Sequence, residues 1–416
     1  MVVLLYAPLM FKIILYHFEI RGIYPLTIFI ISCLALLSGM VNKSFVLAKI
    51  DILVIGFFIY VTSRFYIDGS DHPLVLFLSQ GIFPYFLGRI AGNLVNHSVV
   101  APLYWILGVA VAFIIFEFIA SPASFEGDRI RLFEKNICAY QICDETAGAT
   151  QHYAGSLFGA SACISCMQIM MRGVASRISF EDKNIIVHYG VLLVSLVGLI
   201  FISSKTSLLI TLVICLFISA KSSRIKKMVR LLTFSAVVMT LVVTVASPER
   251  IGFFTSIFSI DLDGINIQDL CFTPESGGSV LGRVSMSIDA LSMWFSEPIL
   301  GVGPGNFGLL DCDVNPKRDG THPHNIFFGL LSELGLIGLL WFAAIVLIPI
   351  VKVLRIEHSL FLGQIIILFS FELGQSFFIS SGYLGNFGIY LFIGIIVTSG
   401  LRSSNRRVVK EPLVKQ

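Results

Sequence analysis

The stretch THPHNIFFGLLSELGLIGLLWFAAIVLIPI, residues 321–350, decides the fold class of this chain. It opens with a polar turn and continues from Ile326 as an apolar run that is long enough to cross a bilayer as a helix. Polar side chains at the point where a chain enters lipid usually serve a function. We therefore place the candidate site at this junction.

The composition agrees with a membrane protein. Of the 416 residues, 56% are hydrophobic and only 13% are charged, and the mean hydropathy is +0.88. A soluble domain could not bury that much apolar surface. The net charge of +3, without a basic patch interleaved with aromatic residues, gives no indication of a nucleic-acid partner. The N-terminal run has no basic start and no small-residue cleavage site, so no signal peptide is expected.

Apolar segments predict an all-α polytopic membrane protein with about 12 transmembrane helices in one bundle. The segments lie near residues 3–18, 22–40, 45–62, 73–88, 99–119, 153–171, 185–202, 206–220, 229–247, 325–350, 359–379 and 383–400. With both termini in the cytoplasm, 17 Lys and Arg residues fall inside and 9 outside, which is the bias that membrane proteins show. Only Ser203-Ser204-Lys205 separates the segments 185–202 and 206–220, so a single long helix is the alternative there.

This topology divides the chain into four parts. Residues 1–247 form transmembrane helices one to nine, residues 248–324 a large outer loop, residues 325–400 helices ten to twelve, and residues 401–416 a cytoplasmic tail. The outer loops contain cysteines that fit the disulfides Cys138–Cys143 and Cys271–Cys312 on an oxidising face. Four free thiols fit equally well, because spacing does not determine pairing.

The large loop is acidic, with ten Asp and Glu residues against four Lys and Arg. An anionic ligand would therefore depend on particular arginines, and Arg283 is the best candidate. It opens an amphipathic helical segment, residues 284–295, which Pro298 closes. A guanidinium group binds a diphosphate through paired donors and keeps its charge. The alternative is that Arg283 is a solvated surface charge.

The motif Gly301-Val-Gly-Pro-Gly305 looks like a phosphate-binding loop, but the signal is weak. No strand precedes it, no Lys-Ser/Thr pair follows it, and Pro304 removes a donor. We predict instead a tight turn where the outer loop returns to the membrane.

The sequence His322-Pro-His324-Asn325 could provide a metal pair, a general base or a helix cap. A metal site lacks a third and fourth ligand at the usual spacing. Asn325 is suited to cap the helix that follows. A histidine near the outer interface can accept a proton from an attacking hydroxyl at neutral pH. Glu333 lies nine residues after His324, on much the same side of the helix, and could orient a partner.

Lys205 lies between two predicted spans. A charge there is costly in the middle of a membrane but acceptable at its outer rim, where it could meet a lipid diphosphate. The alternative is that the side chain only extends to the headgroups. Lys49, Asp51 and Glu117 lie near span ends or pair locally, and we assign them no function.

Several motifs resemble the signature of bacterial O-antigen ligases and of the related O-antigen and exopolysaccharide polymerases. The residues that carry the resemblance are His324-Asn325, Gly335, Gly338, Gly282-Arg283 and PILGVGPGNF at 298–307. The layout of about 12 spans with one large loop before the signature helix is similar as well. The motifs cover roughly the last third of the chain, and the first half is similar in topology only.

The resemblance implies a GT-C-like membrane glycosyltransferase in the bacterial inner membrane, with residues 248–324 in the periplasm. The donor would be a glycan on undecaprenyl diphosphate, and the acceptor a sugar hydroxyl or lipid A-core. His324 matches the proposed catalytic histidine of the family, and Arg283 matches a loop arginine thought to bind the diphosphate. Lys205 stands where relatives usually carry Arg, which keeps the charge but loses the paired donors. We add Arg250, in the same loop, to the diphosphate-binding set.

This scheme requires no metal and no cofactor, and it leaves three functions open. A polymerase that joins lipid-linked repeat units is our first choice, and a chain-length regulator would be a possible partner. A ligase that passes the finished glycan to lipid A-core would use the same residues. Twelve spans also suit a transporter or flippase, but polar residues gather at one face here and not around a midplane site.

Overall fold

The computed structural model describes residues 30, 47–68, 77–78, 80–94, 100–120, 147–171, 185–201, 205–221, 279–307, 323, 325–354, 360–377 and 386–410. Across these ranges the regular structure is entirely helical, without strands, as the sequence predicts. The predicted spans 3–18 and 229–247, and nearly all of 22–40, lie outside the described residues.

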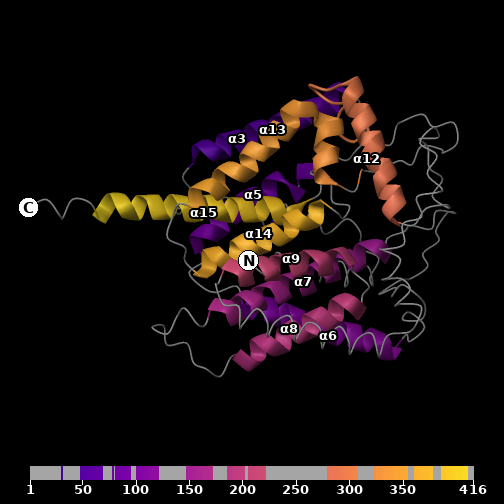
Figure 1. The fold of residues 1–416 in the computed structure, drawn as a ribbon. Helices are drawn as coiled ribbons and strands as arrows, with labels where there is room; N and C mark the ends of the chain where they lie inside the picture. The colour runs from indigo at the N-terminus through magenta and orange to yellow at the C-terminus, as the bar shows by residue number, and fades with distance from the viewer. Residues whose placement is uncertain are drawn as a thin grey trace, which may run out of the picture. The chain divides into compact units, whose positions relative to one another are not determined.

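Ten helices make up the described part of the chain (Figure 1). They are α3 (Lys49–Ile67), α5 (Ile82–Leu94), α6 (Val100–Ala120), α7 (Ala147–Met171), α8 (Ile185–Phe201), α9 (Lys205–Lys221), α12 (Ser279–Ser296), α13 (Ile326–Leu354), α14 (Leu360–Ser376) and α15 (Phe387–Lys410). All but α12 overlap predicted spans, and α12 lies in the predicted outer loop. Two segments, Lys49–Ile67 and Ile326–Val353, are long and apolar enough to cross a membrane, and six others are shorter apolar helices. The total of 12 spans stays a prediction.

The chain separates into two compact units that are interleaved in sequence. One unit comprises Met1–Arg21, His97–Ser259 and Ser370–Gln375, and thus contains α6 to α9. The other comprises Gly22–Asn96, Ile260–Phe369 and Ser376–Gln416, and contains α3, α5, α12, α13, α15 and most of α14. Within the first unit, α8 ends at Phe201 and α9 begins at Lys205, so two helices occupy the stretch where one long helix was the alternative.

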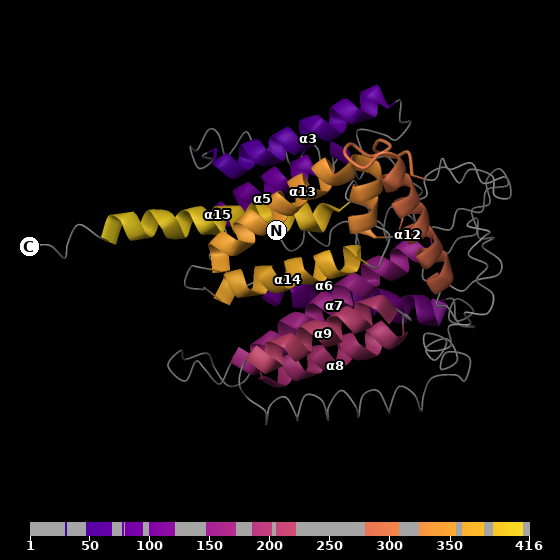
Figure 2. The same cartoon turned by 45° about the horizontal axis from the view of Figure 1, so that its top comes forward.

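The first unit is built around α7, which packs against α6, α8 and α9 (Figure 2). Small residues allow these helices to approach closely: a Cβ atom on Gly198 of α8 would lie only 2.4 Å from the ring of Phe158 on α7. The hydroxyl of Tyr104 on α6 lies 2.8 Å from Ser165 Oγ and 2.7 Å from His188 Nδ1. Tyr104, Ser165 and His188 thus find polar partners on neighbouring helices, which reduces the cost of burying them in an apolar environment.

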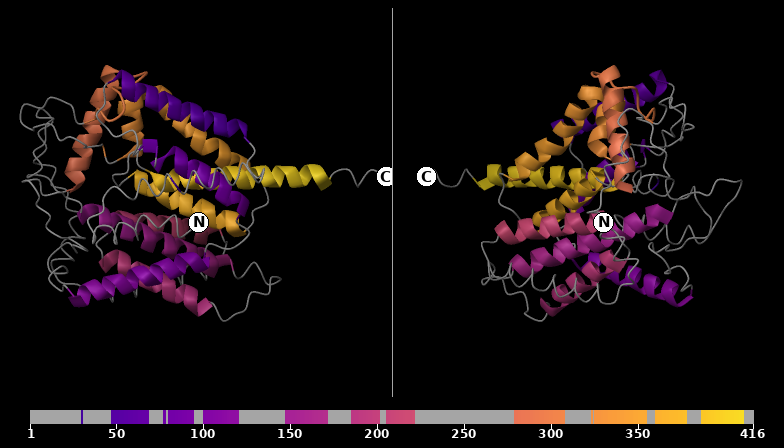
Figure 3. Two further views of the ribbon diagram at one scale, coloured as in Figure 1. Left: turned by 180° about the vertical axis from the view of Figure 1, so that it is seen from behind. Right: turned by 45° about the vertical axis from the view of Figure 1, so that its right-hand side comes forward.

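In the second unit, α5 and α15 lie in backbone contact (Figure 3). A Cβ atom on Gly88 would meet the Leu391 carbonyl oxygen at 2.1 Å, and one on Gly394 would meet the Tyr85 carbonyl at the same distance. Neither position has room for a larger residue. Glycine at both helix surfaces is therefore what allows this packing.

A buried ion pair joins α3, α5 and α15. Arg89 donates from Nε to Asp51 Oδ1 at 2.7 Å and from Nη2 to Asp51 Oδ2 at 3.0 Å. Its third nitrogen donates to Thr398 Oγ1 at 2.6 Å. Asp51 lies near the start of α3, as expected, and accepts a local hydrogen bond from the Ala48 N–H at 2.6 Å, whereas its ionic partner Arg89 comes from another helix. An apolar interior favours such pairing because an isolated charge there would be far more costly.

Candidate functional site

The predicted signature helix begins at Ile326 as expected, but it is not continuous. Gly335 has φ 63° and ψ −165°, a conformation that interrupts α13. In an unbroken helix the N–H groups of Leu336 and Ile337 would donate to the carbonyls of Ser332 and Glu333. The interruption releases all four groups, and each needs another partner in an apolar environment.

The loop before the helix supplies those partners. Val302 N–H donates to the Ser332 carbonyl and Gly303 N–H to the Glu333 carbonyl, both at 2.9 Å. In return, the Pro298 carbonyl accepts from Leu336 N–H at 3.0 Å and the Ile299 carbonyl accepts from Ile337 N–H at 3.3 Å. Residues 298–303 therefore replace the missing hydrogen bonds of the helix, and the two segments hold each other in place.

This pairing explains the glycine pattern. A Cβ atom on Gly301 would lie 2.4 Å from the Glu333 carbonyl carbon, and one on Gly335 would lie 2.3 Å from the Ile299 carbonyl oxygen. Gly301, Gly303 and Gly305 also have positive φ angles of 70°, 103° and 79°, which only glycine adopts readily. The predicted tight turn is confirmed. Because the N–H groups of Val302 and Gly303 are bound to α13, they cannot cradle a phosphate.

Arg64, near the end of α3, holds the same loop from the other side. Its Nη2 donates to the Gly301 carbonyl at 2.9 Å, and its Nε forms a 2.7 Å ion pair with Asp68. The Asp68 carboxylate occupies the space beside Gly303, where a Cβ atom would lie 2.6 Å from Asp68 Oδ2. In the topology predicted from sequence, Arg64 is one of the nine outer Lys and Arg residues, without an assigned role. The spacing of four residues between Arg64 and Asp68 is typical of a local helical ion pair, but no sequence pattern identifies the contact with the loop.

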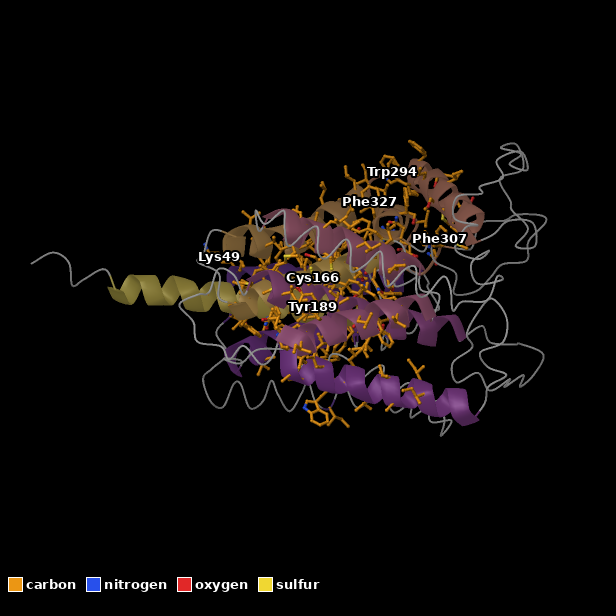
Figure 4. The ribbon with its side chains drawn as sticks, turned by 60° about the horizontal axis from the view of Figure 1, so that its bottom comes forward. Lys49, Cys166, Tyr189, Trp294, Phe307 and Phe327 are labelled. Atoms are coloured by element: carbon orange, nitrogen blue, oxygen red, sulfur yellow. The ribbon has the colours of Figure 1, made fainter. Side chains whose placement is uncertain are left out.

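Helix α12 packs on the first part of α13 through a small apolar core (Figure 4). Ala290 and Met293 of α12 are buried with Phe307 of the loop, and Phe328 of α13 packs against them. Burial also raises the pKa of the half-buried Asp289 carboxyl above its usual range, because a charge is poorly solvated there. The predicted helix at 284–295 is confirmed, although it begins earlier, at Ser279.

Asn325 caps α13, as predicted. Its Oδ1 accepts from Phe327 N–H at 2.9 Å and from Phe328 N–H at 3.3 Å, and its Nδ2 donates to the Phe377 carbonyl at 3.0 Å. The cap fixes where the helix starts, and the bond to Phe377 ties that start to the end of α14. Glu333, two residues before the break, is buried.

The other predicted site residues are described only in part. The main chain of Arg283 lies about one turn into α12, and Lys205 is the first residue of α9, in the other unit. His322, His324 and Arg250 lie outside the described residues. The structure thus brings together Asn325, Glu333, the loop at 301–307 and the helix that carries Arg283.

No group of three or more His, Cys, Asp or Glu side chains in the described ranges could hold a metal ion. Three cysteines of the first unit, Cys163, Cys166 and Cys215, are buried and form no disulfide within the described ranges; Cys166 is labelled in Figure 4. The four cysteines of the predicted disulfides lie outside the described residues.

Comparison with known families supports the resemblance seen in the sequence. A family model described as O-antigen ligase matches residues 190–343. The matched range contains Lys205, Arg250, Arg283, the glycine-rich loop, His324 and the break at Gly335. No curated protein matches the chain.

Proposed function

From membership in the O-antigen ligase and polymerase superfamily, which the match over residues 190–343 supports, we propose that this chain is a membrane glycosyltransferase. It transfers a glycan from undecaprenyl diphosphate to a sugar hydroxyl at the periplasmic face of the bacterial inner membrane. The reaction we propose first is polymerisation of lipid-linked repeat units.

One structural observation carries the proposal. Asn325 caps α13 directly after His324, and α13 packs against the helix in which Arg283 lies. The loop at 298–303, which follows α12 directly, pairs with the break in α13. Helix α12 and the first part of α13 are therefore held together by backbone hydrogen bonds as well as by apolar contacts. A rigid support of this kind is what a general base and a diphosphate-binding arginine need if they are to act on one substrate.

The proposed chemistry is a single displacement. The acceptor hydroxyl attacks the sugar carbon that is joined to the diphosphate, His324 takes the hydroxyl proton, and the bond from that carbon to the diphosphate oxygen breaks. The electron pair of that bond leaves with undecaprenyl diphosphate. Arg283, with Arg250 and Lys205, stabilises the negative charge that grows on the diphosphate. The scheme needs no metal ion and no nucleotide.

A second candidate reaction is ligation, in which the finished glycan is passed to lipid A-core. The description of the matching family, O-antigen ligase, favours it. The same residues would play the same parts, so the two reactions differ only in the acceptor. A chain-length regulator would be a partner of the polymerase.

Deletion of the gene followed by a gel of surface glycans distinguishes the two reactions. A band with a single repeat unit is expected for a lost polymerase, and bare core with lipid-bound polymer for a lost ligase. Complementation with His324→Ala or Arg283→Ala should restore no product, whereas Ser292→Ala, at an exposed position of α12, should restore it fully. Lys205→Arg should retain activity and Lys205→Ala should lose most of it.

Membrane levels of each variant, measured by immunoblot of a tag, separate loss of chemistry from loss of insertion. Full-length polysaccharide from both the His324 and the Arg283 variants would show that the site is assigned wrongly. Equal activity of the two Lys205 variants would remove that residue from the diphosphate-binding set.

A further inference from the structure

The segment that joins α12 to the glycine-rich loop exposes large apolar side chains. We call residues 294–300 the elbow. Phe295 is 71% exposed and Ile299 64% exposed, and Leu300 is exposed beside them. The topology derived from sequence places these residues in the periplasm, where adjacent exposed side chains of this size mark an interaction surface.

The elbow is fixed to the membrane-spanning part of α13. The carbonyls of Pro298 and Ile299 accept hydrogen bonds from Leu336 and Ile337, the first residues after the break. Those two residues are themselves exposed, and Leu340, one turn further, is 60% exposed. Exposed apolar side chains therefore lie both on the elbow and on the part of α13 to which the elbow is hydrogen-bonded.

Helix lengths indicate the depth of the elbow. From Gly335 to Lys352, α13 rises about 26 Å at 1.5 Å per residue, close to the roughly 30 Å of a bilayer core. Helix α3 (Lys49–Ile67) covers about 27 Å in the same way, and its Arg64 contacts Gly301 of the loop. Lys49 and Lys352 are both exposed at the opposite ends of these helices.

Each of the two spans thus has a lysine at one end and the loop with its elbow at the other. The hydrocarbon boundary then falls at the break in α13, nine residues after the apolar run begins at Ile326.

The direction of the helices agrees with this depth. In Figures 1 and 2, α12 and the part of α13 beside it run crosswise to α3 and α15, and so across the end of the spans. At the same level, Tyr66 near the end of α3 is 77% exposed, and Trp294 donates its indole N–H to the Pro298 carbonyl at 2.9 Å. Tyr and Trp are the residues that gather where a membrane meets water.

We propose that the elbow is seated in the headgroup and upper acyl region of the bilayer, with phospholipids as its partner. The membrane span of α13 is then residues 335–353, and residues 326–334 lie along the surface with α12. That this is the outer leaflet rests on the proposed function. The main chain of Arg283, in α12, then lies over the headgroup plane, the level at which a lipid carries its diphosphate.

Collision measurements with a spin label test the proposal without any substrate. A nitroxide amino acid is introduced at Ile299, at Phe295 or at Leu340 in the full chain, in vesicles of phosphatidylethanolamine and phosphatidylglycerol. Oxygen, which concentrates in lipid, and a water-soluble nickel chelate are the two collision partners. Leu340, on the span itself, is the lipid-facing reference.

At Ile299 and Phe295 we expect the label to collide more often with oxygen than with the nickel chelate. The ratio of oxygen collisions to nickel collisions should be lower at these two positions than at Leu340. Dominant collisions with nickel at Ile299 would place the elbow in water and overturn the proposal. Low collision rates with both reagents would mean that protein covers the elbow, such as a second copy of the chain, and would overturn it as well. Either failure leaves the tests of His324 and Arg283 unaffected, because the label measurement needs no activity.

Discussion

Replacement of Gly335 by alanine tests the pairing between the loop and the break in α13. The backbone there, with φ 63° and ψ −165°, lies in a region that is almost exclusive to glycine; for other residues it costs about 1–3 kcal/mol. The new methyl group would also meet the Ile299 carbonyl oxygen at 2.3 Å, so the loop would have to move.

Alanine offers the chain an alternative, because an unbroken helix restores the hydrogen bonds from Leu336 to Ser332 and from Ile337 to Glu333. The loop then loses its four backbone bonds to α13, each of which contributes about 0.5–1.5 kcal/mol net. We therefore expect attachment of the loop to weaken by about 2–6 kcal/mol.

The assay compares Gly335→Ala with Gly108→Ala, a matched control on α6 where a Cβ atom meets nothing within 4 Å. Complemented cells should make at least tenfold less polymer with Gly335→Ala at equal membrane levels, and limited proteolysis should cut the loop sooner. The control should behave as wild type. Wild-type polymer and wild-type protease resistance in Gly335→Ala would refute the account of the break.

Two further predictions concern the neighbours of this loop. Arg64→Ala should weaken loop attachment by about 2–3 kcal/mol, since it removes a charged donor from the Gly301 carbonyl and leaves Asp68 without its cation. Protease sensitivity measured beside the exposed control Ser63→Ala should show this, and equal sensitivity would contradict it. Asp289→Asn should raise thermal stability at neutral pH. Burial raises the carboxyl pKa, so the stability contribution of Asp289 is complete below about pH 3.9, its unfolded value, and declines as pH rises through the folded value. The difference between the unfolding midpoints of the two proteins should therefore widen as the pH rises from 4 to 7, and a difference that does not change with pH would contradict the raised pKa of the half-buried Asp289 carboxyl.

The sequence alone determined the features that depend on neighbouring residues. Apolar composition predicted the helical class, because backbone groups in lipid must be satisfied within a helix. Asn325 before an apolar run predicted the cap of α13, and the closely spaced glycines at 301–305 predicted a turn. Both are decided by the chemistry of a few consecutive residues, whose hydrogen bonds close over one helical turn or less.

Only the tertiary structure decided what the break in α13 does. A single glycine in an apolar run is ordinarily tolerated within a transmembrane helix, so Gly335 alone did not indicate an interruption. The interruption exists because residues 298–303, some 30 positions earlier, offer donors and acceptors that match the four released groups. The contact of Arg64 with Gly301 and the pair of Arg89 with Asp51 have the same origin. Each satisfies a buried polar group with a partner from a distant segment, and no local pattern records which segment that is.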